Sequence, residues 1–189
     1  MSKTQQQRVV FDEFEAGELA VEWDDKEPQE VLGWAIETFK GRLAISASLQ
    51  SDDMAIIDMA WRIDPKVRVF TIDTLRLPPA TYDLIADVKR KYGIEMEILK
   101  PDAREVKAMV DRHGMDLMYD AVPLRLLCCE VRKVNPLIKL LPELDCWVTG
   151  LRRDQWASRS NIRKIEIDND HGGLVKLNPL ADWMEEEVW

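Results

Sequence analysis

The sequence has 189 residues, 46% of them apolar and 32% charged, with a formal net charge of -9 at pH 7. These values are typical of one globular domain with a hydrophobic core, and they exclude a disordered chain. The negative charge argues against general nucleic-acid binding, because phosphate backbones require a basic face. Three cysteines are too few for a secreted disulfide framework. With no apolar run of membrane-spanning length and no signal-peptide pattern at the N-terminus, we expect a cytoplasmic protein without membrane contact.

Strand and helix patterns alternate along the chain. Residues 1–27 are acidic without clear periodicity, and we predict an N-terminal arm with a short helix there. A helix is predicted to begin at Pro28, since proline favours the first helical position. Three strand–loop–helix units follow, with strands at residues 42–46, 67–73 and 94–100 and helices at residues 54–63, 81–93 and 103–114.

The second half of the chain continues this alternation. Residues 123–141 are predicted to be helical with a break near Pro136, and residues 145–150 form a buried strand. A hairpin with its turn at 169–173 is predicted near the end. The order predicts an α/β fold, in which residues 28–189 form one domain with a parallel sheet covered by helices on both faces. Ligands of such sheets bind outside the carboxyl ends of the strands, where SASLQSDD, DTLRLP and TGLRRDQ stand here.

The loop at residues 46–53 leaves a strand and enters a helix. Free N–H groups and the helix dipole make such a terminus suitable for an anion. The alternative is ordinary N-capping, in which Ser51 or Asp52 begins the helix and no ligand binds there. The pattern alone favours capping, because the loop lacks the glycines of a Walker motif.

Two further clusters contain residue types that can bind anions or metals. Arg152, Arg153 and Arg159 leave the strand at 145–150, where guanidinium groups could bind sulfate or phosphate, or pair with surface carboxylates; their position favours the ligand. Cys128 and Cys129 point about 100° apart on a helix and so do not bond to each other. They are either small core residues or thiolates favoured by the neighbouring cations, as in soft-metal and iron–sulfur sites.

The segments SLQSDDM, LCCEVRKVNPL, TGLRRDQ and KLNPLADW together resemble assimilatory adenylyl-sulfate (APS) reductases of the phosphoadenylyl-sulfate reductase family, from roughly Pro28 to the last residue. The resemblance implies an adenine nucleotide α-hydrolase-like sheet. It also implies reduction of adenylyl sulfate to sulfite and AMP, in sulfate assimilation and cysteine biosynthesis, with thioredoxin or glutaredoxin as the reductant. The tandem cysteines are typical of members that hold a four-iron four-sulfur (4Fe-4S) cluster.

The resemblance also implies roles for individual residues. Two loops around the nucleotide are matched by Ser46, Ser48, Leu49 and Gln50 and by Asp73, Thr74 and Arg76. The sulfate and phosphate site is matched by Arg152 and Arg153, the first two cluster ligands by Cys128 and Cys129, and a lysine between cluster and substrate by Lys133.

The sequence departs from the family pattern in the pocket loops. Ala47 stands where the family has phenylalanine, Leu75 stands where it has glycine, and Trp156 follows Gln155 in place of serine. A glycine at position 75 would permit an unusual φ that leucine disfavours. The preference between adenylyl sulfate and 3′-phosphoadenylyl sulfate therefore stays open.

Family members continue past the segment matched here by Glu187, Val188 and Trp189. The continuation holds a Cys-x-x-Cys pair and a Glu-Cys-Gly-Leu-His tail that carries the nucleophile. The resemblance thus places the catalytic nucleophile beyond Trp189, and it implies an incomplete cluster in the printed sequence. Cys146 is predicted to be a core thiol, and His113 and His171 have no partner pattern.

Two alternatives to a reductase stay open. One is a catalytically inactive, truncated paralogue that binds an adenine nucleotide or 3′-phosphoadenylyl sulfate. The other is an enzyme that activates its substrate with ATP, whose Ser-Gly-Gly-x-Asp-Ser loop is absent here. A homo-oligomer is also left open.

Overall fold

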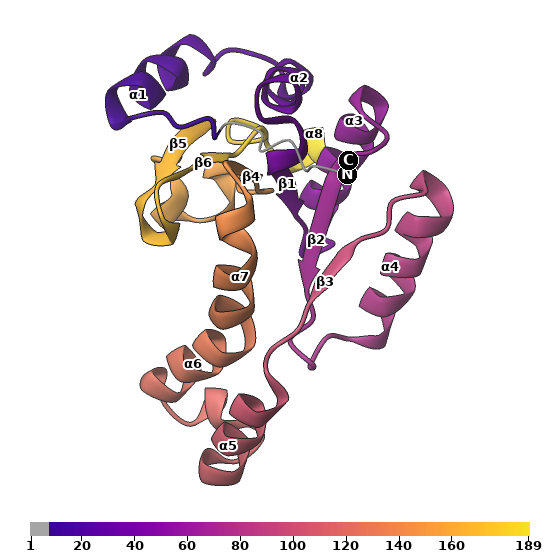
Figure 1. The fold of residues 1–189 in the computed structure, drawn as a ribbon, viewed down its shortest axis with the longest axis vertical. Helices are drawn as coiled ribbons and strands as arrows, with labels where there is room; N and C mark the ends of the chain where they lie inside the picture. The colour runs from indigo at the N-terminus through magenta and orange to yellow at the C-terminus, as the bar shows by residue number, and fades with distance from the viewer. Residues whose placement is uncertain (1–7) are drawn as a thin grey trace, which may run out of the picture.

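The computed structural model describes residues 8–189 and has one six-stranded sheet with the order β3-β2-β1-β4-β6-β5 (Figure 1). The strands are β1 Leu43–Ser46, β2 Arg68–Ile72, β3 Glu97–Leu99, β4 Cys146–Val148, β5 Ile165–Asp168 and β6 Leu174–Leu177. Neighbouring strands are parallel, except that β5 and β6 form the antiparallel hairpin. The predicted α/β fold is confirmed. Within the described residues, no helix is both long and apolar enough to cross a membrane.

The helices begin and end close to the local sequence signals. They are α1 Glu13–Glu22, α2 Pro28–Phe39, α3 Ser51–Ile63, α4 Pro79–Tyr92, α5 Ala103–His113, α6 Val122–Cys129, α7 Asn135–Leu140 and α8 Glu185–Val188. Proline occupies the first turn of α2 and of α4. Gly93 closes α4 in the left-handed conformation at φ 70°, where glycine carries no steric penalty.

Residues alternate between the two faces of the sheet, so each strand contributes to two cores. On one face Ile45 and Val148 pack in the larger core with α2, α3 and part of α4. On the other face Ala44 and Trp147 pack against α7. Cys146 is fully buried on the larger core's face, and burial raises the pKa of its thiol, which confirms the prediction of a core cysteine.

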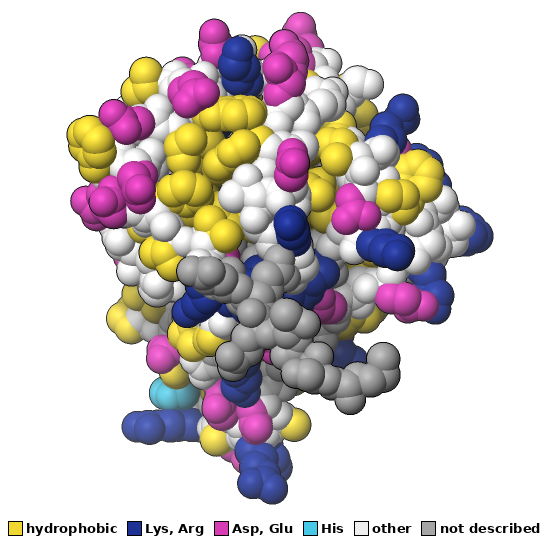
Figure 2. All heavy atoms as spheres, turned by 45° about the horizontal axis from the view of Figure 1, so that its top comes forward, with side chains coloured by type: hydrophobic (Ala, Val, Ile, Leu, Met, Phe, Trp, Pro, Cys, Tyr) yellow, Lys and Arg dark blue, Asp and Glu magenta, His cyan; other side chains and the backbone are white. Residues whose placement is uncertain are grey.

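The N-terminal segment is packed more closely than an arm would be. Among its described residues, Val9, Phe11 and Trp23 pack against the larger core, and α1 lies against β5. Phe14 and Val21 of α1 stay exposed. Figure 2 shows apolar and acidic side chains intermixed on the upper face of the molecule. The acidic composition conceals these apolar contacts in the sequence. Residues 1–7 of the predicted arm lie outside the described residues.

The break predicted near Pro136 lies slightly earlier, in a π-helical turn at Glu130–Val134 between α6 and α7. Pro136 itself stands in the first turn of α7. We call residues 103–134 the helical lobe, because α5 and α6 project together beyond the sheet (Figure 1). The helical lobe has a small core of its own around Met109 and Leu117.

Candidate functional site

A cavity opens where the connections leave the sheet in opposite directions. β1 and β4 are neighbours, but the chain continues from β1 to β2 on one side and from β4 to the hairpin on the other. Such a switch point is the usual ligand site of an open α/β sheet. The cavity there, called the switch-point cavity below, measures about 290 Å³. Its walls are Ser46, Ser48, Gln50, Asp52, Asp53, Trp147, Thr149, Gly150, Leu151, Gln155, Arg159 and Lys176.

The first loop is held by the start of α3. Ser48 donates from its N–H and from its hydroxyl to Oδ2 of Asp53, each at 2.7 Å. Burial raises the pKa of the Asp53 carboxyl, although these two bonds oppose the rise. The helix begins at Ser51, as the capping alternative expected, but its N-cap residue Gln50 makes no side-chain cap bond. The loop is held by the carboxylate of Asp53.

Gly150 brings the loop after β4 against the start of α3. A Cβ atom at Gly150 would lie 2.5 Å from Oδ1 of Asp53 and 3.3 Å from its backbone nitrogen. Only glycine permits this approach. The contact sets the width of the switch-point cavity, because it joins two of the cavity's walls.

Arg152 and Arg153, predicted to bind the anion, contact protein groups instead. Nε of the buried Arg152 lies 2.5 Å from Oδ1 of Asp52, and its Nη1 donates to the carbonyl of Trp183. Arg153 pairs with Asp24 at 2.5 Å and donates to a backbone carbonyl. A buried carboxylate such as Asp52 requires a charged partner, and this requirement orients Arg152. Neither arginine lines the switch-point cavity in this structure, so their role in anion binding stays a prediction.

The cations that line the switch-point cavity are Arg159 and Lys176. Arg159 bonds to Gln155. Lys176 stands opposite Trp147 in the β4–β6 ladder and lies 3.0 Å from Glu166. From the sequence, Arg159 was grouped with Arg152 and Arg153 as arginines that could bind an anion, and Lys176 was missed. The alternation of β6 was a signal for Lys176, because it turns that residue away from the larger core.

Trp147 also lines the switch-point cavity. Its ring lies edge-to-face with His171 at 5.6 Å, and its indole nitrogen is buried without a hydrogen-bond partner in the described part of the chain. No partner pattern was found for His171 in the sequence, but the structure gives it a partner: its Nδ1 lies 2.9 Å from the Asp168 carboxylate. The Asp-x-x-His spacing across the hairpin turn was the missed signal.

The second loop faces the helical lobe rather than the switch-point cavity. The buried Asp73 accepts bonds from the N–H of Leu75 and the hydroxyl of Tyr82, both at 2.8 Å. Leu75 has φ 60°, the conformation for which the family's glycine is suited. Arg76 binds the helical lobe. Thus the first and third loops meet in one cavity, whereas Asp73, Thr74 and Arg76 line a different surface.

The tandem cysteines lie at the end of α6. Cys128 is buried in the core of the helical lobe, Cys129 is half-buried, and Lys133 is exposed in the π-helical turn that follows. Such turns are frequent at functional sites. In the residues that the structure describes, no three His, Cys, Asp or Glu side chains are grouped to hold a metal. A 4Fe-4S cluster ordinarily needs four thiolates, so the described residues alone do not form its site.

Trp189, beyond which the resemblance places the nucleophile, is not part of the candidate site. Its side chain is 87% exposed, and it does not line the switch-point cavity. It follows α8, which contacts α3, the helix whose start forms one wall of that cavity. The described residues hold no candidate for the nucleophile in this region. Its placement beyond Trp189 therefore stays a prediction from the resemblance.

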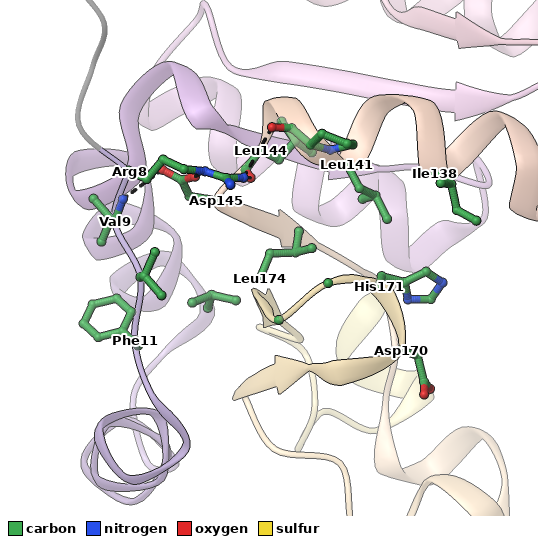
Figure 3. A pocket seen from close by; sticks show the side chains of 15 residues that line it. Arg8, Val9, Phe11, Ile138, Leu141, Leu144, Asp145, Asp170, His171 and Leu174 are labelled. Carbon is green, nitrogen blue, oxygen red and sulfur yellow. Dashed lines mark hydrogen bonds and ion pairs between the residues drawn. The ribbon is translucent and has the colours of Figure 1, made fainter.

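A larger cavity of about 630 Å³ lies at the opposite edge of the sheet, where β4 and β6 begin. Figure 3 shows Arg8 reaching Asp145 at one end of this cavity and His171 at the other. Most of the lining side chains between them are apolar, such as Leu141 and Leu174. It is larger than the switch-point cavity, but it lies away from the carboxyl ends of the strands, where ligands of this fold bind.

Solved structures support the fold. A phosphoadenylyl-sulfate reductase from Candida auris, solved as a phosphate complex, is 28% identical with a TM-score of 0.80, covering 96% of this chain and 86% of that one. An FMN adenylyltransferase from Candida glabrata bound to ATP has a TM-score of 0.58 at 12% identity, covering 96% of this chain and 57% of that one. The second likeness shows the fold alone.

Sequence relatives agree. Adenosine 5′-phosphosulfate reductase from Allochromatium vinosum is 42% identical over 147 residues, or 78% of this chain. Its namesake from Pseudomonas aeruginosa is 39% identical over 93% of this chain. The chain spans 57% and 67% of the lengths of these two relatives. The phosphoadenosine phosphosulfate reductase domain matches residues 42–189. The chain therefore belongs to the phosphoadenosine phosphosulfate reductase domain family.

Proposed function

We propose that the protein is an adenylyl-sulfate reductase of sulfate assimilation, whose switch-point cavity binds the nucleotide. The observation that carries the proposal is the pairing of hydroxyls with two cations, Arg159 and Lys176, at the carboxyl edge of β1 and β4. Adenylyl sulfate joins a phosphate to a sulfate, so it presents two anionic groups. Charge-assisted bonds from two cations suit such a ligand. The names of the sequence relatives above support the same substrate.

The cavity favours a short anionic chain over a triphosphate. Asp52 and Asp53 form part of its wall, and Asp52 already forms an ion pair with Arg152. Further phosphates would add negative charge beside these carboxyl groups, and among residues 8–189 no cation other than Arg159 and Lys176 lines the cavity. We expect AMP and adenylyl sulfate to bind more tightly than ATP.

In the whole protein, a cysteine thiolate would attack the sulfur of adenylyl sulfate, the S–O bond would break, and AMP would leave. Thioredoxin or glutaredoxin would then reduce the S-sulfocysteine to free sulfite and a thiol, becoming oxidised to its disulfide. We assign the nucleophile to none of the three cysteines described. For a 4Fe-4S cluster, Cys128 and Cys129 would supply two thiolates, and the others would come from outside the described residues. A cytoplasmic location remains our prediction.

A second candidate is a paralogue that binds an adenine nucleotide or 3′-phosphoadenylyl sulfate without reducing it. Leu75 at φ 60° and the buried Ala47, both departures from the family pattern, favour this candidate. Thioredoxin-dependent sulfite release from adenylyl sulfate by the full-length protein, purified without oxygen, separates the two. Nucleotide binding without sulfite release would support the paralogue.

Isothermal titration with adenylyl sulfate, AMP and ATP tests the site. We expect Arg159→Met and Lys176→Met each to weaken adenylyl sulfate binding by roughly 10- to 100-fold, since each removes a charge-assisted bond. Arg90→Met, which removes an exposed cation of α4, is the control and should leave affinity unchanged. Equal affinity for ATP, or full affinity in both cavity variants, would contradict the assignment.

A further inference from the structure

The second loop and the helical lobe each contribute one arginine that donates hydrogen bonds to the other. Arg76 of the loop donates to the carbonyl of Met115 at 2.6 Å and to Oδ1 of Asp116 at 2.8 Å. In the opposite direction, Arg132 of the helical lobe donates to the carbonyl of Thr74 at 2.8 Å. Met115 lies between them, with its sulfur 3.9 Å from Nη2 of Arg132. We call these four contacts the arginine clasp.

Arg132 is an unusual residue for a protein core. It is 3% exposed, its Nε has no hydrogen-bond partner in the described part of the chain, and its contacts there are a carbonyl and a thioether. No ion pair joins it to a carboxylate of residues 8–189. A buried charge without an anion does not stabilise a fold, and its replacement by an apolar side chain is often neutral or stabilising. Global stability therefore does not explain Arg132.

The position of the clasp offers an explanation. The helical lobe has its own core, which includes Cys128 and is separate from the two cores of the sheet. A unit with separate packing can shift as a body unless directional bonds fix it. The arginine clasp ties the lobe to the loop that leaves β2, one strand away from the switch-point cavity. Arg132 follows Cys128 by four residues, so the bond to Thr74 is applied close to the cysteines.

We propose that Arg76 and Arg132 are positioning residues that hold the cysteine-bearing helical lobe at a fixed place beside the nucleotide loops. Arg76 therefore acts through the lobe rather than by touching the substrate. The clasp itself can be tested without a ligand. Its effect on the reaction rests on the function proposed above, and the two parts are measured separately.

The first measurement is the rate at which iodoacetamide labels Cys128 in the 189-residue chain, whose described residues alone do not form the cluster site. Labelling is followed by mass spectrometry, and the melting temperature is measured in parallel. We expect Arg76→Met and Arg132→Met each to raise the rate about tenfold or more, because the lobe opens more often. Arg132→Met should not lower the melting temperature. Arg132→Lys should restore part of the protection, since its ammonium group can still donate to Thr74. Arg125→Met, an exposed change on α6, should alter neither quantity.

A double-mutant cycle then asks whether the two arginines act as one device. The double variant should label no faster than either single variant, whereas independent effects would multiply. Unchanged labelling in both single variants, multiplied effects, or labelling that rises only in proportion to a lower melting temperature would overturn the clasp.

The second measurement is sulfite release by the full-length protein. If the clasp positions the lobe, Arg132→Met should lower kcat about tenfold or more while KM for adenylyl sulfate changes less than about threefold. Faster labelling with an unchanged kcat would overturn the positioning role. Absence of sulfite release from the wild-type protein would instead count against the proposed function, and the labelling result would still decide the clasp.

Discussion

At the scale of single residues, the second loop holds a side chain in a conformation that it disfavours. Leu75 has φ 60°, and its N–H is fixed by the carboxylate of Asp73. The left-handed conformation costs a residue with a Cβ about 1–2 kcal/mol. Because Leu75 is 47% exposed, its side chain regains little of this cost through burial.

We therefore expect Leu75→Gly to leave the free energy of unfolding unchanged or to raise it by up to about 1 kcal/mol. Glycine removes the steric cost but loses about 0.5–1 kcal/mol to the entropy of the unfolded chain. Leu126→Gly in α6, where leucine is 63% exposed on a regular helix, should lose about 1 kcal/mol. Urea unfolding of both variants measures the difference. An equal loss in the two would show that residue 75 is not strained.

The Asp53 carboxyl gives a pH-dependent prediction. Burial raises its pKa, so the folded state favours its neutral form, and the group opposes folding increasingly as pH rises above about 3.9, the unfolded value. Asp53→Asn keeps an oxygen for the two bonds from Ser48 without the charge. This variant should exceed the wild type in stability at pH 7, with the difference shrinking toward pH 4.

Asp58 provides a control of opposite sign. Burial would raise its pKa, but bonds from Arg62 and Tyr92 outweigh this effect and lower the pKa. Asp58→Asn should lose stability at pH 7, and this loss should fade as pH falls through the lowered pKa. Urea unfolding between pH 3 and pH 7 compares both variants, and the same sign in both would contradict the assignment of Asp53.

At the scale of elements, the contact between the loop after β4 and the start of α3 shapes the site. Gly150→Ala would place a Cβ 2.5 Å from Oδ1 of Asp53, and the backbone nitrogen behind that oxygen leaves little room to relax. We expect a loss of about 1–3 kcal/mol in unfolding free energy, together with weaker AMP binding.

Gly17→Ala is the matched control for this prediction. Gly17 lies inside α1, and a Cβ there would meet nothing within 4 Å. This change should stabilise the protein by up to about 1 kcal/mol through helix propensity and leave AMP binding unchanged. Thermal unfolding and AMP titration of both variants make the comparison. Normal AMP affinity in Gly150→Ala would separate the loop contact from the nucleotide site.

At the scale of the whole molecule, the features that could be predicted from the sequence are those that depend on local periodicity. The three strand–loop–helix units and the meeting of the loops at residues 46–53 and 149–159 follow from alternation and from parallel strands. The direction of Arg152 could not be predicted, because its partner Asp52 lies 100 residues away. Lys176 was missed for a similar reason, since it enters the cavity only because β6 pairs with β4 across the chain order.

The N-terminal segment depends on another distant contact. Asp145, whose side chain is 1% exposed, lies 3.1 Å from Arg8, 2.8 Å from Arg42 and 2.9 Å from the N–H of Val9. Burial would raise the pKa of this carboxyl, but the three partners lower it. A lowered pKa in the folded state means stabilisation that is present above about pH 3.9 and lost as pH falls through the folded value. Asp145 thus joins the N-terminal segment to the start of β4 at neutral pH.

We expect Asp145→Asn to lower the unfolding free energy by about 2–3 kcal/mol at pH 7, since a carboxylate that pairs two arginines is removed while Arg42 stays largely buried. The loss should diminish as pH falls, because the wild-type carboxylate becomes protonated as well. Hydrogen exchange should also quicken in residues 8–22, which are held to the sheet in part through Val9. Asp111→Asn, at an exposed ion pair within α5, should change stability by less than about 0.5 kcal/mol. If Asp145→Asn loses stability without faster exchange in residues 8–22, the N-terminal segment is held by its aromatic contacts and not by Asp145.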